Sequence, residues 1–145
     1  MNYLCLPDIP EHPVGAASGT QTGSYIYGTE YQCEQTPVLD PSHHNNDVPC
    51  VVCDVEGRSR VLMIPAKMSC PDGGWVKEYQ GLLMSEHRSH KGSDFICVSD
   101  GMEDLSGGSG DDDGGTLYVV ETKCGSLKCP PYVEDYEVAC VVCTK

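Results

Sequence analysis

The sequence is poor in basic and aromatic residues and has no long apolar segment. It holds 9 Lys and Arg against 22 Asp and Glu, a formal net charge of −13, with one Trp and one Phe in 145 residues. This acidity disfavours nucleic acid and anionic membrane surfaces as partners, because both repel a negative chain. No apolar run reaches the ~18–20 residues that cross a bilayer. The N-terminus also lacks the basic and apolar regions of a signal peptide, so we interpret Met1 as the start of a mature or truncated fragment.

Catalytic motifs are absent as well. The sequence contains no GxSxG nucleophile elbow, no HExxH zinc motif and no glycine-rich phosphate loop. It also contains no Asn-x-Ser/Thr acceptor for N-linked sugars. We therefore expect no enzymatic activity and no cofactor, apart from the possible calcium ion considered below.

Cysteine is the residue that the sequence has in excess. Ten cysteines, an even number without zinc-finger spacing, indicate disulfides formed in an oxidising compartment, so we expect a secreted, extracellular protein. Each disulfide stabilises a small domain by about 2–4 kcal/mol, which supplements a modest apolar core. All ten are predicted to form disulfides: Cys5, Cys33, Cys50, Cys53, Cys70, Cys97, Cys124, Cys129, Cys140 and Cys143.

One short stretch occurs twice and ends two parallel runs of sequence. The stretch VPCVVC at 48–53 recurs as VACVVC at 138–143. The period of roughly ninety residues is far longer than that of a solenoid and indicates a duplicated domain. Two further pairs of cysteines align when the runs are counted backwards, Cys33 with Cys124 and Cys5 with Cys97.

The repeat predicts two tandem β modules, residues 1–58 and 59–145. The second module begins with a segment, 62–92, that has no counterpart in the first. The first module is therefore predicted to be incomplete at its N-terminus. If Met1 is a true terminus, this module lacks a strand and exposes an unpaired sheet edge, which recruits strands from other chains.

The two valines between the cysteines of each CxxC favour an extended backbone. Residues i and i+3 of a strand point to opposite faces, so the two sulfurs of one CxxC cannot easily bond each other. We favour structural disulfides to different partners over a zinc or redox site. A local bridge can join Cys124 to Cys129, and the connectivity of the others stays open. The long-range partners of the CxxC cysteines are expected among Cys5, Cys33, Cys70 and Cys97.

Short aromatic and β-branched runs between glycines and prolines predict an all-β, disulfide-rich fold with long loops. Apolar residues never repeat at helical spacing over ten residues, so we expect little helix. The segments 51–55 and 61–64 are predicted to form a hairpin around Gly57. All the expected strands are 24–27, 51–55, 61–64, 75–84, 95–98, 116–120 and 138–142.

An acidic, glycine-rich loop follows the expected strand 95–98. Calcium takes several carboxylate oxygens, so this loop is a candidate calcium site, although its spacing does not match an EF-hand. The alternative is a solvated loop. Two histidine clusters, 43–44 and 87–90, could bind a transition metal, but neither has a carboxylate or cysteine at ligand spacing. The candidate calcium ligands are Asp100, Glu103, Asp104, Asp111, Asp112 and Asp113.

Several segments resemble the C-terminal domain of the invertebrate secreted proteins called short-chain collagen C4-like, which are related to spongin short-chain collagens. A more distant resemblance connects 70–75 and the Tyr79-x-Gly81 that follows to the non-collagenous domain of collagen IV. This second resemblance implies assembly by strand exchange between modules. The chain itself has no Gly-X-Y repeat and hence no triple helix. The main segments carrying the first resemblance are 2–7, 27–32, 48–53, 62–67, 70–71, 79–81, 124–127, 129–133 and 140–145.

The leading functional hypothesis is a non-enzymatic extracellular structural or matrix protein that associates with itself. Such a protein could assemble into fibres, because repeated head-to-tail contacts need not close into a ring. A second hypothesis is a secreted carbohydrate- or calcium-dependent, lectin-like module that uses the acidic loop and nearby tyrosines. Its partners would be glycans or matrix components. A protease inhibitor with a disulfide-braced loop is a third, supported only by cysteine density.

Overall fold

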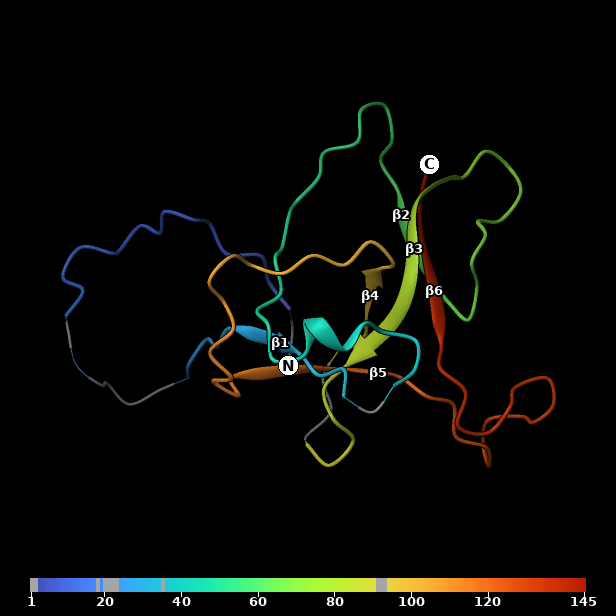
Figure 1. The fold of residues 1–145 in the computed structure, drawn as a ribbon. Coiled ribbons are helices and arrows are strands. Elements are labelled where there is room, and N and C mark those ends of the chain that lie inside the picture. The colour runs from blue at the N-terminus through green and yellow to red at the C-terminus, as the bar shows by residue number, and fades with distance from the viewer. Residues whose placement is uncertain (1–2, 18, 20–23, 35, 91–93) are drawn as a thin grey trace.

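The regular secondary structure of the described residues is nearly all β-strand, and long loops connect the strands (Figure 1). The computed structural model describes residues 3–17, 19, 24–34, 36–90 and 94–145. The polar segments 5–23, 35–49 and 87–93, which the sequence predicts to be loops, lie partly outside these residues. No helix in these ranges is long and apolar enough to cross a membrane. The all-β prediction is confirmed. The elements observed in the structure are β1 Thr29–Tyr31, the 3-10 turn η1 Pro41–His43, β2 Val61–Pro65, β3 Val76–Ser85, β4 Ile96–Ser99, β5 Gly115–Val119 and β6 Ala139–Thr144.

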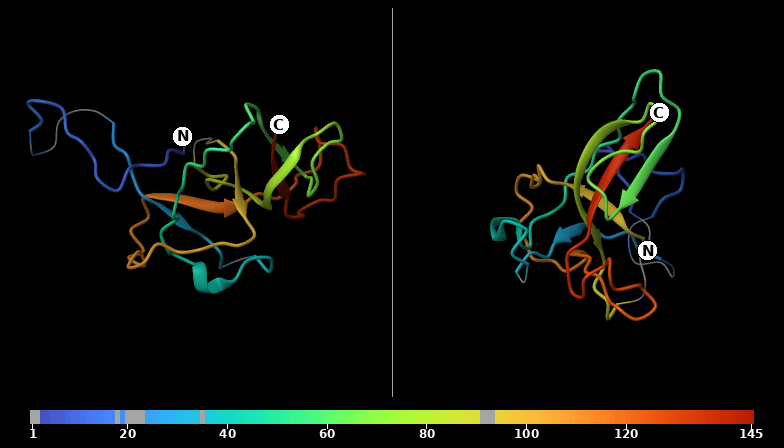
Figure 2. Two further views of the ribbon diagram at one scale, coloured as in Figure 1. Left: turned by 90° about the horizontal axis from the view of Figure 1, so that it is seen from above. Right: turned by 90° about the vertical axis from the view of Figure 1, so that its right-hand side faces the viewer.

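The strands form one mixed sheet in the order β1-β5-β3-β6-β2, with β4 paired to β3. Only β1 and β5 are parallel; every other pair is antiparallel. Figure 1 shows β1 and β5 running across the direction of β2, β3 and β6, and Figure 2 shows the last three side by side. The long strand β3 joins the two parts, because it pairs with β6 over most of its length and with β5 at its end.

Gly81 lets β4 approach β3 closely. A Cβ at this position would lie 1.8 Å from the carbonyl oxygen of Val98, so any side chain would push the strands apart. The core lies on both faces of β3, because neighbouring strand residues point to opposite sides. Leu83 packs in one cluster and Met84 in the other. The cluster with Met84 also holds Tyr31, Cys33 and Leu117, and the cluster with Leu83 also holds Cys97, Val138 and Cys140.

The structure has four disulfides, and two of them correspond to each other under the internal repeat. Cys97 bonds Cys140 with a separation of 43 residues, and the aligned pair Cys5 and Cys50 bonds with a separation of 45. The two cysteines of 140–143 have different partners, as a strand requires, because Cys143 bonds Cys70. The expected local bridge from Cys124 to Cys129 is also present.

Two of the ten predicted disulfide cysteines, Cys33 and Cys53, are free. The repeat explains both exceptions. Cys53 aligns with Cys143, but Cys70, the partner of Cys143, lies in the segment 62–92 that residues 1–58 lack. Cys33 aligns with Cys124, and residues 1–58 hold no counterpart of Cys129. The prediction that Cys33 bonds a CxxC cysteine is therefore wrong.

Two expected strands are not formed where the sequence predicts them. Residues 51–55 are not a strand, so the predicted hairpin with 61–64 is wrong, and the partner of β2 is β6. Residues 24–27 are also not a strand; β1 begins at Thr29. Valine favours a strand only where a neighbouring strand is available to pair with it. Val51 and Val52 have none and are 78% and 82% exposed.

Candidate functional site

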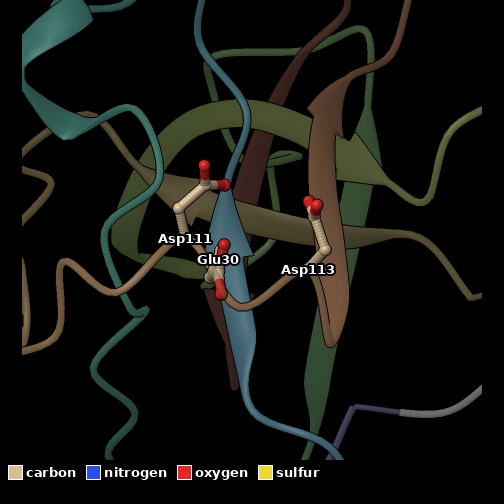
Figure 3. Close-up of side chains that lie close together, drawn as sticks. All are labelled: Glu30, Asp111 and Asp113. Carbon is tan, nitrogen blue, oxygen red and sulfur yellow. The ribbon is translucent and has the colours of Figure 1, made fainter.

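The acidic loop brings two of its carboxylates to β1. Asp111 and Asp113 lie beside Glu30, and one carboxylate oxygen of each residue lies within 4.8 Å of the others. Figure 3 shows Glu30 on β1, with the two aspartates on the segment that leads into β5. The backbone N–H of Asp112 donates a hydrogen bond to Glu30 Oε1 at 2.8 Å, which holds the loop against the strand. We call Glu30, Asp111 and Asp113 the carboxylate cluster.

The other predicted calcium ligands lie elsewhere. Asp100 accepts a hydrogen bond from Gln80 at 3.2 Å, and Asp104 contacts Nδ1 of His43 at 2.7 Å. Glu103 is exposed, and Asp112 contributes its backbone N–H to the cluster rather than its carboxylate. The prediction of one site formed by Asp100, Glu103, Asp104, Asp111, Asp112 and Asp113 is therefore wrong, and only Asp111 and Asp113 belong to a common group.

A glycine contact separates the two halves of the loop. The backbone N–H of Asp47 donates to the carbonyl of Gly108 at 2.7 Å, and the carbonyl of Asp47 accepts from Leu105 at 3.0 Å. A Cβ on Gly108 would lie 2.4 Å from the Asp47 carboxylate, so glycine permits this contact. Beyond it the chain returns to β1 with Asp111 and Asp113 at φ of 54° and 51°. Aspartate tolerates this left-handed region better than most residues.

Glu30 was missed as a site residue by sequence reasoning. The available signal was an acidic residue flanked by Thr29 and Tyr31, both good strand formers, since a carboxylate in a half-buried strand needs a partner. The pairing of Glu30 with Thr116 in parallel β1 and β5 places it beside the loop that precedes β5. This pairing joins segments 86 residues apart (116 − 30), which no local pattern reveals.

The histidine clusters do not form a metal site. Within the part of the chain that the structure describes, the carboxylate cluster is the one group of three ligands close enough to share an ion, and it contains no histidine or cysteine. His43 pairs with Asp104, and the rings of His87 and His90 lie 5.8 Å apart at a broad surface cavity. No zinc or transition-metal geometry results.

Glu86 lines the same cavity and connects two strands of the sheet. Burial acts to raise the pKa of this carboxyl, but hydrogen bonds from Thr116, from the N–H of His87 and from His90 outweigh it and hold the pKa below its ordinary value. The Thr116 N–H donates to Glu86 Oε2 at 3.1 Å, which joins the end of β3 to β5. A carboxylate held in this way is suited to bracing the sheet rather than to accepting a proton from a substrate.

The outer edge of β2 is a second candidate site. Arg60 and Lys145 exchange both backbone hydrogen bonds at 3.0 Å. Antiparallel alternation then turns the backbone groups of Leu62 and Ile64 toward β6, and those of Val61, Met63 and Pro65 outward. Proline has no N–H and suits an edge. Among the strands that the structure describes, β2 pairs with β6 alone.

The other edge of the sheet is covered. Tyr31 donates to the carbonyl of Asn46 at 3.0 Å, and Val48 donates to the carbonyl of Thr29 at 2.9 Å. Residues 45–48 thus lie along β1 and occupy its outer edge. The unpaired edge predicted for residues 1–58 is therefore not at β1. Among the described strands, β2 and β4 each pair with one neighbour only, and both lie within 59–145.

The chain matches no known family model, no curated protein and no solved structure. The resemblance to short-chain collagen C4-like proteins and the division at residue 58 therefore stay predictions. The four disulfides by themselves indicate an oxidising environment.

Proposed function

We propose that the chain is a non-enzymatic, secreted structural protein of the extracellular matrix that binds a second copy of itself through the outer edge of β2. The observation that supports this is the outer edge of the apolar strand VLMIP, which has no partner among the strands described and where Val61 is 74% exposed. A second strand added at this edge would satisfy the outward N–H groups of Val61 and Met63. It would also cover the apolar side chains from water.

Charge favours a head-to-tail contact over two β2 strands facing each other. Arg60 and Lys67 flank β2, and neither forms a salt bridge among the residues described. In an antiparallel β2–β2 pair these cations would approach their counterparts. The segment 94–113, by contrast, holds seven acids and no Lys or Arg, and Figure 1 shows this loop away from β2. A contact between unlike surfaces continues into fibres when its rotation does not close.

Light scattering after size-exclusion chromatography tests this proposal. We expect the wild-type mass to rise with protein concentration and to fall with added NaCl, because salt screens the charge attraction. Val61→Lys should return the protein to a monomer, since a lysine on an edge strand opposes strand addition. Val51→Lys is the matched control: Val51 is equally exposed at 78% but lies outside the sheet. A monomer at every concentration, or an equal effect of both variants, contradicts the proposal.

A carbohydrate-binding module is the second candidate, and exposed tyrosines favour it. Tyr25 and Tyr27 are 61% and 60% exposed, with ring centroids 6.1 Å apart. They lie beside the acidic loop, because a Cβ on Gly114 would be 3.2 Å from Cβ of Tyr27. Exposed aromatic rings of this kind present apolar faces together with a polar tip. A glycan array with and without a chelator tests this candidate, and a blank array under both conditions removes it.

A further inference from the structure

The Glu30 side chain has one oxygen without a partner among the residues that the structure describes. The residue is 3% exposed. Its Oε1 accepts the hydrogen bond from the Asp112 N–H, whereas Oε2 is buried and receives no hydrogen bond from these residues. Burying a polar oxygen without a partner is unfavourable, and a charged oxygen more so. The folded chain therefore leaves a strong oxygen acceptor in the carboxylate cluster unsatisfied.

The neighbours of Glu30 add negative charge instead of compensating it. Asp111 and Asp113 bring two more carboxylates, with oxygens within 4.8 Å of one another, and like charges at such distances repel. None of the three forms a salt bridge with a Lys, Arg or His in the ranges that the structure describes. In the view of Figure 3, Glu30 lies below Asp111, and Asp113 lies to the right of both. A cation would offset all three charges and satisfy the buried oxygen.

We propose that Glu30, Asp111 and Asp113 bind a calcium ion. All three ligands are carboxylates, which suit hard cations and not zinc or copper. Calcium–oxygen distances of about 2.3–2.6 Å allow two ligand oxygens to lie up to about 5 Å apart across the ion. The three ligand oxygens lie within 4.8 Å of one another, so they can all reach one ion of this size. Magnesium, at about 2.0–2.1 Å, is smaller and requires a stricter octahedron. Water and backbone carbonyls would complete the coordination.

Calcium at this position would join β1 to the loop that leads into β5. These strands pair over only three residues, from Thr29 with Gly115 to Tyr31 with Leu117. The ion would bind ligands from both sides of this short parallel pair and hence favour the folded state over the unfolded chain. The site does not include β2, so the inference does not depend on self-association.

Calcium titration of the chelator-treated protein tests the site. Isothermal titration with CaCl₂ should show one ion per chain with a Kd of about 0.1–1 mM, the range of extracellular calcium modules. At 10 mM calcium the Tm should rise by about 3–10 °C. NaCl at equal ionic strength should leave the Tm unchanged, and MgCl₂ should raise it less. Absence of both the heat and the Tm shift with calcium overturns the proposal.

Variants at the site separate coordination from general charge. Glu30→Gln should abolish the calcium response and leave the calcium-free Tm unchanged or higher, because it removes a buried charge. The exposed pair Asp111→Asn and Asp113→Asn should also abolish the response, and this double variant keeps the test valid if Glu30→Gln does not fold. Asp112→Asn is the control, since Asp112 contributes its backbone N–H and the charge change is the same. A retained response in Glu30→Gln, or an equal loss in Asp112→Asn, contradicts calcium binding here.

Discussion

The two copies of the VxCVVC stretch have nearly the same sequence and opposite environments. Residues 139–144 form β6, between β2 and β3, and Val141 is fully buried. Residues 51–53 form no strand and are exposed. Both copies keep the aligned disulfide, Cys97 with Cys140 and Cys5 with Cys50. In this comparison the valine-rich stretch is a strand where neighbouring strands lie on both sides of it. A disulfide at the aligned position does not by itself produce a strand.

The largest difference should appear when the two aligned disulfides are removed. Their loops have separations of 43 and 45 residues, so loop-closure entropy predicts nearly equal losses of about 4 kcal/mol. Cys140 is fully buried and Cys50 is exposed. The double variant Cys97→Ala/Cys140→Ala should therefore lose at least about 1 kcal/mol more than Cys5→Ala/Cys50→Ala, because it also leaves a cavity. Urea unfolding of both variants gives the two values, and equal losses would mean that packing around the bridges does not differ.

A smaller difference is expected for the aligned valines. Val141→Ala should reduce the free energy of unfolding by about 2 kcal/mol, since two buried methyl groups and their contacts are lost. Val51→Ala should change it by less than about 0.5 kcal/mol, as for other exposed positions. Chemical denaturation measures both. A substantial loss in Val51→Ala would show that the first copy is packed in solution.

The smallest effect on stability concerns the two free thiols. Alkylation of exposed Cys53 should proceed at pH 8 and change the free energy of unfolding by less than about 0.5 kcal/mol. Cys33 is buried, and burial, followed by the charges of Asp104 and Asp40, raises its pKa from 9.0 to about 11. At pH 8 the folded protein should therefore expose at least about 100-fold less Cys33 thiolate than the urea-unfolded chain. Peptide mapping of alkylated sites measures both thiols.

The pH dependence of the Cys33 thiol has a defined sign. The unfolded chain releases this proton near pH 9 and the folded chain near pH 11. The stability that folding gains from a neutral thiol is complete below pH 9 and is lost as the pH rises toward 11. Cys33→Ala should accordingly show a shallower decline over this window than the wild type. Rapid alkylation of Cys33 in the folded protein at pH 8 would contradict its burial.

Much of the fold could be predicted from local sequence. The runs near β2, β3, β4, β5 and β6 were placed within one or two residues of their observed bounds, because apolar and β-branched residues alternate between clear turn signals. The repeat aligned the cysteines whose bridges correspond, and strand geometry predicted that Cys140 and Cys143 have different partners. The failures were residues 24–27, residues 51–55 and the cysteines Cys33 and Cys53. In the last three cases the described residues offer no neighbouring strand or no free cysteine partner.

The candidate calcium site was predicted only in part. Sequence identified Asp111 and Asp113 by their place in an acidic, glycine-rich loop, but it grouped them with Asp100, Glu103, Asp104 and Asp112. The carboxylates of 100–104 lie apart from those of 111–113 because the contact of Gly108 with Asp47 divides the loop. The third member of the carboxylate cluster, Glu30, lies on β1, the partner strand of β5.

The sequence by itself determined most of the strand-forming segments, the oxidising environment that a high cysteine content indicates and the acidic character of the loop, because each depends on residue type and local spacing. Only the tertiary structure decided which valine run became a strand, which cysteines paired, which edges of the sheet stayed free and which carboxylates met. These depend on pairing between segments far apart in the chain, such as β1 with β5 and β2 with β6. Backbone hydrogen bonding makes any strand a possible partner for any other, so the choice is made by the packing of the whole sheet.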